Sequence, residues 1–385
     1  MFKAASLMNR LSNQPTVVHI LNGLQFGGNE TLCLQLLRHA PKDVHNILLI
    51  LNPDHQEMLP LFQQIPGLSI VFNGVSPQRR YQFVHSLYRQ FQVWRPQAVL
   101  IYPFGIHPFA GLAARLARIP FVAVRAGNPP PQIGVPGRWK WRTLLSISWI
   151  FNIPVYSCSY ATHQALATLM PMPPRSFAIP NGCDIDNIAQ RAETSRCKAK
   201  TENGLVIGMV ARLNTIKDQA TLIRAYEQLC RVHTQVELWL VGDGAERARL
   251  EHLCEHLGVS GTVKILGRRS DIPELLGQMD IYAFSTTEDE GFGIALVEAM
   301  AASLPIVASD VAACREVLGN GEAGILVPPQ DVGAMVKALE TLIVSPHVRE
   351  QWGQRAQARV SKHYSIQTCA QRWYNQLLAE GGYQN

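Results

Sequence analysis

Short apolar runs alternate with segments of helical periodicity along most of the chain. In the first half we predict strands over Thr16–Leu21, Asn46–Leu51, Leu68–Phe72, Ala98–Tyr102, Phe121–Val124, Val155–Cys158 and Ser176–Ile179. Helices are predicted over Glu30–His39, Gln82–Trp94 and Pro108–Ala117. Continuous Val, Ile and Leu runs separated by helices are typical of parallel sheets that helices cover on both faces.

The same pattern restarts after a polar segment, Asp186–Asn203, which we predict to be an interdomain linker. The strands predicted after it are Leu205–Val210, Val236–Val241, Val263–Leu266, Ile281–Phe284 and Ile306–Ala308. A helix over Ala220–Arg231 follows the first of them, and the chain ends with a helix at about Ile366–Leu378. The sequence therefore predicts two doubly wound α/β domains, over 1–190 and 191–364.

Composition narrows the class of protein. The chain has 385 residues, of which 47% are apolar and 17% are charged. These values exclude a disordered chain and a small disulfide-stapled protein. The net charge of +6 is uneven, since residues 1–190 hold 15 Lys/Arg against 6 Asp/Glu, and residues 191–385 hold 20 against 23. A basic half favours nucleic acid, anionic lipid or phosphorylated ligands, and composition does not choose among them.

Cysteine usage and hydropathy indicate a cytoplasmic protein. The 8 cysteines form no C-x-x-C pair and no cluster with zinc spacing, so reduced thiols are expected. The start lacks an unbroken apolar segment of the kind that a signal peptide carries, and no run reaches the ~18 apolar residues of a membrane span. The segment RWKWR, Arg138–Arg142, fits either an interfacial membrane anchor or an amphipathic helix that faces a core.

Ligands of doubly wound sheets bind beyond the carboxyl ends of the strands, so the loops there are the candidate sites. The first loop, Asn22–Glu30, places Gly27 and Gly28 before a helix, where backbone N–H groups can approach an anion. A tight strand–helix turn explains this glycine pair equally well. The loop ARLNTIKDQ carries Arg212 and Lys217, whose natural counter-charge is a diphosphate, although solvated surface charge is the alternative.

The most informative segment is TTEDEGFGIALVEAMAASLPIVAS, residues 286–309. It places Glu290 in a glycine-rich loop and Glu298 on the helix that follows, roughly 12 Å apart if the segment were all helical. That separation is too large for two carboxylates that share one glycosidic bond, but it suits carboxylates that bind different hydroxyls of one extended ligand. The N–H groups of Phe292, Gly293 and Ile294 at the helix start can hold a phosphate between them.

His107 is the strongest histidine candidate in the first half. It follows a predicted strand and precedes Pro108, a favoured first residue of a helix, which predicts a position at a helix N-terminus beside the ligand. A capping or packing histidine is the competing interpretation.

Two other motifs carry little weight as sites. Asp184-Ile185-Asp186 lacks further metal ligands nearby, and Gly242-Asp243-Gly244 lacks the third glycine of a dinucleotide fingerprint.

As a set, these motifs resemble the retaining glycosyltransferases of family 4, which have two facing Rossmann-like domains and an interdomain cleft (the GT-B fold). The resemblance rests on the Gly27–Gly28 turn, HPFAGLAARLARIPFV from His107, PNGCD at 180–184, VARL…K at 210–217, VGDG at 241–244, EGFGIALVEAMA at 290–301, PIVAS at 305–309 and GILVPP at 324–329. Starch and glycogen synthases carry Lys-Thr-Gly-Gly-Leu near the start, and here GLQFGGNE stands instead, so that branch is not expected.

The resemblance implies a nucleotide-sugar donor in the second domain, and no bound metal or cofactor. A UDP-sugar is the expected donor, with GDP- and ADP-sugars as the alternatives. It implies that Gly27 and Gly28 approach the diphosphate, that Arg212 and Lys217 neutralise it, and that Phe292, Gly293 and Ile294 give backbone contacts. Glu290 would bind sugar hydroxyls, Glu298 the ribose, and His107 would lie beside the donor sugar near the reacting carbon. His107 and Glu290 are the expected catalytic residues. The last helix, 365–385, would pack back on the first domain.

The implied activity is a hexosyltransferase-type, configuration-retaining transfer to a glycan, lipid-linked or other hydroxyl acceptor in cell-envelope, exopolysaccharide or glycolipid synthesis. The basic first half then bears on the acceptor, or on an anionic membrane surface at the inner face of the plasma membrane, and nucleic acid is not expected. A sugar-nucleotide epimerase on the same fold and a non-catalytic sugar-nucleotide binder remain alternatives.

Overall fold

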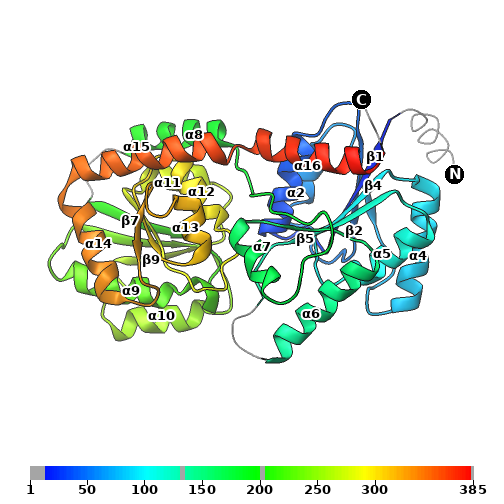
Figure 1. The fold of residues 1–385 in the computed structure, drawn as a ribbon. Helices are drawn as coiled ribbons and strands as arrows, with labels where there is room; N and C mark the ends of the chain where they lie inside the picture. The colour runs from blue at the N-terminus through cyan, green and yellow to red at the C-terminus, as the bar shows by residue number, and fades with distance from the viewer. Residues whose placement is uncertain (1–13, 131–134, 200–203, 383–385) are drawn as a thin grey trace. The chain divides into compact units, whose positions relative to one another are not determined.

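A computed structural model describes residues 14–130, 135–199 and 204–382 of the chain. The chain divides into two units, one made of Met1–Gly182 with Ile366–Asn385 and the other of Cys183–Ser365. The first unit is thus completed by α16 (Ile366–Glu380), the last helix of the chain (Figure 1).

The first unit contains a six-stranded sheet whose neighbouring strands are all parallel, in the order β3-β2-β1-β4-β5-β6. Its strands are β1 (Thr16–Leu21), β2 (His45–Ile50), β3 (Ser69–Phe72), β4 (Ala98–Ile101), β5 (Phe121–Ala126) and β6 (Val155–Ser157). This order, with a reversal between β1 and β4, is that of a doubly wound fold. The predicted strand Ser176–Ile179 is wrong, because only Ala178 makes a bridge, to Ser157, and prolines at 173, 174 and 180 remove the N–H groups that a longer ladder needs.

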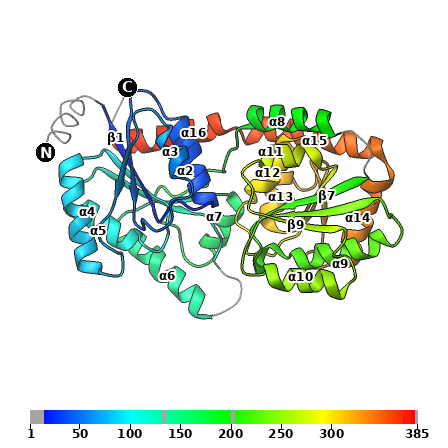
Figure 2. The same cartoon turned by 180° about the vertical axis from the view of Figure 1, so that it is seen from behind.

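Helices cover both faces of this first sheet (Figures 1 and 2). They are α2 (Gly28–Arg38), α3 (Leu59–Gln63), α4 (Arg80–Trp94), α5 (His107–Leu116), α6 (Val135–Ile150), α7 (Tyr160–Ala167) and α16. One apolar core joins the sheet to α2, α3 and α16, where Trp373 and Leu377 are fully buried. The other core joins the opposite face of the sheet to α4 and α5 and to Leu145 of α6.

The second unit repeats this order with β12-β11-β10-β7-β8-β9, again all parallel. Its strands are β7 (Leu205–Val210), β8 (Val236–Val241), β9 (Val263–Gly267), β10 (Ile281–Phe284), β11 (Ile306–Ser309) and β12 (Ile325–Val327). Its helices are α8 (Ile185–Ala199), η1 (Thr215–Lys217), α9 (Gln219–Cys230), α10 (Arg247–His256), α11 (Ile272–Gln278), α12 (Ile294–Ala301), α13 (Ala312–Leu318), α14 (Val332–Val344) and α15 (Pro346–His363). The sequence prediction lacked β12, whose three residues lie directly before two prolines.

The predicted linker at 186–203 is wrong over 186–199, because residues 185–199 form helix α8 of the second unit, and its last four positions lie outside the described residues. α8 packs against α11, and Arg191 forms an ion pair of 2.6 Å with Glu274 of that helix. Ile188 and Ala192 are buried on one side of α8 while most of its other residues are polar. The polar composition therefore belongs to the exposed side of an amphipathic helix, and the predicted boundary at 190 falls inside it. Across the described residues, no helix has the length and the apolar character that a membrane crossing requires.

Candidate functional site

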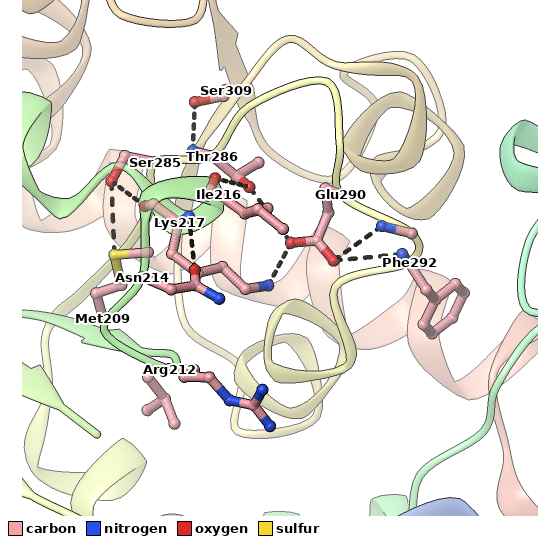
Figure 3. Close-up of polar contacts among 12 residues, drawn as sticks. Met209, Arg212, Asn214, Ile216, Lys217, Ser285, Thr286, Glu290, Phe292 and Ser309 are labelled. Carbon is pink, nitrogen blue, oxygen red and sulfur yellow. Dashed lines mark hydrogen bonds and ion pairs between the residues drawn. The ribbon is translucent and has the colours of Figure 1, made fainter. Parts of the chain in front are cut away.

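A polar cluster lies in the second unit, in the loops that follow β7 and β10 (Figure 3). β7 and β10 are adjacent in the sheet, and parallel strands present their carboxyl ends at the same edge. The short helix η1, after β7, carries Lys217, and the glycine-rich loop after β10 carries Glu290. Strand order thus brings together two side chains that are 73 residues apart in the sequence.

Lys217 and Glu290 form an ion pair in which both side chains are largely buried, at 19% and 8% exposure. The carboxylate of Glu290 also accepts hydrogen bonds from Thr286 Oγ1 (3.3 Å) and from the N–H groups of Gly291 (3.2 Å) and Phe292 (3.4 Å). Burial on its own raises the pKa of Glu290, but the charge of Lys217 and these hydrogen bonds outweigh it, and the pKa is lowered. At neutral pH the site therefore holds an ionised carboxylate against an ammonium group.

Hydrogen bonds from four polar side chains near the strand ends hold the loops that carry Lys217 and Glu290. These side chains are Asn214, Ser285, Thr286 and Ser309. Asn214 Oδ1 accepts the N–H of Lys217 at 3.2 Å and so caps η1. Thr286 Oγ1 donates to the carbonyl of Ile216 (2.9 Å), and the Thr286 N–H donates to Ser309 Oγ (2.9 Å). Sequence reasoning missed these roles, although Ser285 and Thr286 directly follow an apolar strand, which is a signal that could have marked them.

Arg212 occupies a different environment from Lys217, although the sequence paired them as one anion-binding set. Its side chain is exposed, and its carbonyl accepts a hydrogen bond from Gln219 Nε2 at 3.0 Å. In Figure 3 its guanidinium group lies apart from the Lys217–Glu290 pair. Arg212 thus presents its charge to solvent, whereas Lys217 is neutralised by a carboxylate of the chain.

Helix α12 begins directly after Gly293, as predicted, and it carries Glu298. Gly293 has a φ of +80°, in the left-handed region, so a side chain at this position would strain the turn. Burial raises the pKa of Glu298 to about 7, the opposite direction from Glu290. Phe292 directs its N–H to Glu290 in this structure, and its ring packs edge-on against Tyr364 at 5.7 Å.

The candidate residues of the first unit differ in their exposure to solvent. Gly27 adopts an extended conformation and caps α2 without a side-chain hydrogen bond, and Gly28 is exposed. His107, the first residue of α5, is fully buried. Its Nδ1 contacts the carbonyl of Phe104, its Nε2 lies 2.9 Å from Ser148 Oγ, and burial lowers its pKa. This is the environment of a packed histidine, and a catalytic role for His107 stays a prediction.

The Asp-x-Asp motif has a local structural role. Asp184 Oδ1 accepts the N–H of Asn187 at 3.3 Å in the first turn of α8. Within the parts of the chain that the structure describes, no three His, Cys, Asp or Glu side chains are grouped in a way that could hold a metal ion.

Residues 190–359 match the family described as "Glycosyl transferases group 1". The chain is 33% identical over 177 residues to the phosphatidyl-myo-inositol mannosyltransferase of Mycobacterium leprae, which covers 45% of this chain and 46% of that protein. It is 30% identical over 221 residues to the D-inositol 3-phosphate glycosyltransferase of Corynebacterium jeikeium, covering 53% and 52%. The chain therefore spans about half the length of the curated relatives it matches.

Similarity to solved structures extends over both units. HepE of Anabaena, crystallised with UDP and glucose, aligns with a TM-score of 0.80 and 22% identity over 94% of this chain and 98% of its own. Sucrose-phosphate synthase of Thermosynechococcus elongatus aligns with a TM-score of 0.78 and 19% identity, over 95% and 100%. Together with the two parallel six-stranded sheets, these similarities confirm the predicted GT-B fold.

Proposed function

We propose that the protein, whose residues 190–359 match the glycosyl transferases group 1 family, transfers a sugar from a nucleotide-sugar to a hydroxyl group of an acceptor. The observation that supports this most directly is the buried pair of Lys217 and Glu290 beside the start of α12. A carboxylate held ionised in a buried place can accept hydrogen bonds from sugar hydroxyls. An ammonium group and the uncapped N-terminus of a helix next to it suit a phosphate.

The difficult step of such a reaction is the departure of the nucleoside diphosphate, whose negative charge increases as the glycosidic bond breaks. In the proposed reaction Arg212 and Lys217 stabilise that charge, together with the N–H groups of Gly293 and Ile294. Glu290 orients the sugar, and Glu298 binds the ribose. Side-chain cations would supply the positive charge that a metal ion supplies in other transferases, so we expect activity in the presence of a chelator.

We further propose that the donor is a UDP-sugar and that the configuration at the anomeric carbon is retained. HepE, a structural neighbour, was crystallised with UDP and glucose, and this supports uridine as the base. Relatives that act on phosphatidyl-myo-inositol and on inositol phosphate support a glycolipid or other phosphate-bearing acceptor. In the single-step route that we propose for retention, the acceptor attacks on the face that the leaving group departs from, and the departing phosphate accepts the acceptor's proton.

The test uses conservative substitutions in the buried pair. Glu290→Gln and Lys217→Gln are expected to lower acceptor-dependent release of UDP by at least about a hundredfold. The matched control is Lys264→Gln, because Lys264 pairs with Glu237 at 2.7 Å on the exposed side of the same unit. Thermal unfolding of each variant separates lost chemistry from lost folding. Full transfer activity in both site variants would overturn the proposal. Conversion of the donor in the absence of an acceptor would indicate an epimerase. Binding of the donor without any turnover would indicate a non-catalytic sugar-nucleotide binder.

We propose a cytoplasmic location at the inner face of the plasma membrane, with unit 1 against the lipid. Residues 58–182 contain 11 Lys/Arg and no Asp/Glu. On α6, Trp139 and Ile150 are 63% and 74% exposed, and the guanidinium of Arg142 lies 5.4 Å from the centre of the Trp139 ring. Exposed tryptophan among cations suits the interface of an anionic bilayer.

Cosedimentation with phosphatidylcholine vesicles, with and without phosphatidylglycerol, tests this location. Binding is expected only with the anionic lipid and is expected to weaken as salt rises. The triple variant Arg138→Gln, Lys140→Gln, Arg142→Gln is expected to reduce it, whereas Arg231→Gln, Arg249→Gln, Arg269→Gln in the other unit is not. Absence of binding at low salt would contradict the membrane proposal and leave the proposed transferase activity untouched.

A further inference from the structure

Arg125 is a buried cation in the first unit that none of the functions above uses. It lies near the carboxyl end of β5, and only 3% of its surface is exposed. Its Nη1 donates to Asn29 Oδ1, its Nη2 donates to Asn181 Oδ1 at 3.0 Å, and its Nε has no hydrogen-bond partner among the described residues. Both acceptors are neutral amides, and Arg125 forms no ion pair with a carboxylate in the described part of the chain.

A buried charge of this kind is unusual, because burial removes the water that stabilises a cation, and proteins generally pair such groups with an opposite charge. Amide dipoles compensate only part of a full charge. The guanidinium therefore leaves a positive potential at the carboxyl edge of the first sheet.

The position of the guanidinium connects this charge to the first turn of α2. Asn29 is the second residue of that helix. Gly127, just after β5, allows the close approach, since a Cβ there would lie 2.8 Å from Arg125 Nη1 and 3.5 Å from Asn29 Oδ1. Arg125 is thus packed directly against the start of α2.

The first turn of α2 offers hydrogen-bond donors to solvent. The helix is 11 residues long and has no side-chain cap, and its first intrahelical bond runs from the Thr31 N–H to Gly27 O (2.9 Å). The N–H groups of Gly28 and Asn29 therefore have no acceptor within the helix. Gly28 is exposed, and a Cβ built on it would meet no atom within 4 Å, so space remains above this turn.

Arg125 also determines which end of the Asn29 amide faces outward. A guanidinium group has donors only, so the amide oxygen of Asn29 must face it. The NH₂ group of Asn29 is then directed away from Arg125. In this way the buried cation orients a neutral donor beside the free N–H groups of the same turn.

We propose that Arg125 is a positioning residue for a phosphate group bound at the first turn of α2, where it supplies the charge and orients Asn29. This inference rests on the proposed transferase function, and it assigns the first unit a preference for a phosphate-bearing ligand. The phosphate belongs either to the diphosphate of the donor or to the acceptor, and the two sources share the same recognition chemistry.

The test compares the full-length protein with Arg125→Gln and Arg125→Lys. The matched control is Arg175→Gln, because Arg175 belongs to the same unit but its charge is already paired, with Glu380. Calorimetric titration measures affinity for UDP, for uridine, and for inorganic phosphate in the presence of saturating UDP. Circular dichroism and thermal unfolding check that each variant is folded.

If the phosphate is that of the donor, Arg125→Gln weakens UDP binding by at least about tenfold, leaves uridine binding unchanged, and Arg125→Lys recovers part of the loss. If it is that of the acceptor, UDP binding is unchanged and binding of inorganic phosphate is lost. A purely structural role would lower stability and weaken UDP and uridine equally, and that result, or unchanged binding of all three probes, would overturn the proposal. Failure of the wild-type protein to bind UDP would instead contradict the proposed transferase function.

Discussion

The two units share one strand order but place positive charge differently at the carboxyl edge of their sheets. In the second unit a buried Lys217 is paired with Glu290 of the same chain. In the first unit a buried Arg125 is bonded to the amide oxygens of Asn29 and Asn181. The second unit therefore neutralises its own cation and keeps an oriented carboxylate, whereas the first unit retains an excess of positive charge.

The comparison teaches that the fold positions the loops and the loops determine the chemistry. In both sheets the order of the strands reverses at the corresponding place, between β1 and β4 in the first and between β7 and β10 in the second. The side chains at these two places differ in charge balance, because Lys217 is paired with a carboxylate and Arg125 is bonded only to neutral amides. The same asymmetry extends to the surface, since residues 58–182 have no acidic residue while the second unit carries exposed ion pairs such as Arg315–Asp310 (2.5 Å).

The largest expected effect comes from breaking the buried pair of the second unit. Lys217→Met leaves the Glu290 carboxylate buried without its partner and is expected to lower the free energy of unfolding by about 3–5 kcal/mol. The double variant Lys217→Met, Glu290→Leu is expected to lose less than the sum of the single variants. Urea denaturation of the full chain measures this, with hydrogen exchange to identify the unit that unfolds.

The exposed pair Lys264–Glu237 is the control for this cycle. Its removal should change the free energy of unfolding by less than about 1 kcal/mol, because solvent screens the pair. An equal effect of the two pairs would show that burial of Lys217 and Glu290 does not distinguish the second unit.

An effect of similar size is expected from the dependence of the first unit on the last helix. Trp373 of α16 is buried against the first core, so Trp373→Ala is expected to lower the free energy of unfolding by about 3–5 kcal/mol. Hydrogen exchange should then increase in the first unit and stay constant in the second. Trp139→Ala, on the exposed side of α6, should change stability by less than about 0.5 kcal/mol. Increased exchange in both units would contradict the view that each unit has a core of its own.

The strands of both sheets were predictable because buried parallel strands are short continuous apolar runs with turns on both sides. Errors arose where that signal is weak. β12 is only three residues long, and Ser176–Ile179 reads as a strand although the prolines around it limit the ladder to one bridge. The segment 185–199 resembled a linker because most of its residues are polar, whereas the structure uses the few apolar ones, Ile188 and Ala192, to anchor α8.

The candidate site could be predicted as a set of residues but not as a set of contacts. The loops after β7 and β10 were identified because ligands bind where parallel strands end. The bond between Lys217 and Glu290 was not, because no local pattern connects residues that are 73 positions apart. Arg125 was overlooked although it directly follows the predicted strand Phe121–Val124, because only the fold shows that it is buried and bonded to Asn29 and Asn181.

Acid should affect the first unit through His19, a buried residue of β1 whose pKa burial lowers to about 4. Its ring nitrogens lie 3.1 Å from Tyr102 Oη and 3.2 Å from Asn46 Oδ1. Since the unfolded chain binds this proton more readily, the stability from neutral His19 is complete above pH 6.5 and is lost progressively as pH falls towards 4. The loss amounts to about 3 kcal/mol. Urea midpoints from pH 7 to 4 should fall less in His19→Gln, and equal slopes would contradict this origin.

Glu298 has a pH dependence of the opposite sign in the second unit, and its effect on ligand affinity is the smallest change expected here. Burial raises its pKa to about 7, so the folded protein holds this proton more tightly than the unfolded chain, and stability from it declines as pH rises from about 4.5 to 7. Binding of a ribose should have the reverse dependence, because an ionised carboxylate accepts hydrogen bonds from both hydroxyls. Affinity for UDP-glucose, whose diphosphate does not titrate near neutral pH, is therefore expected to rise up to about tenfold from pH 6 to 8. Glu298→Gln should remove this dependence, whereas Glu237→Gln, with its exposed carboxylate, should keep it. An identical pH profile in wild type and Glu298→Gln, measured by calorimetry, would show that the ribose is bound elsewhere.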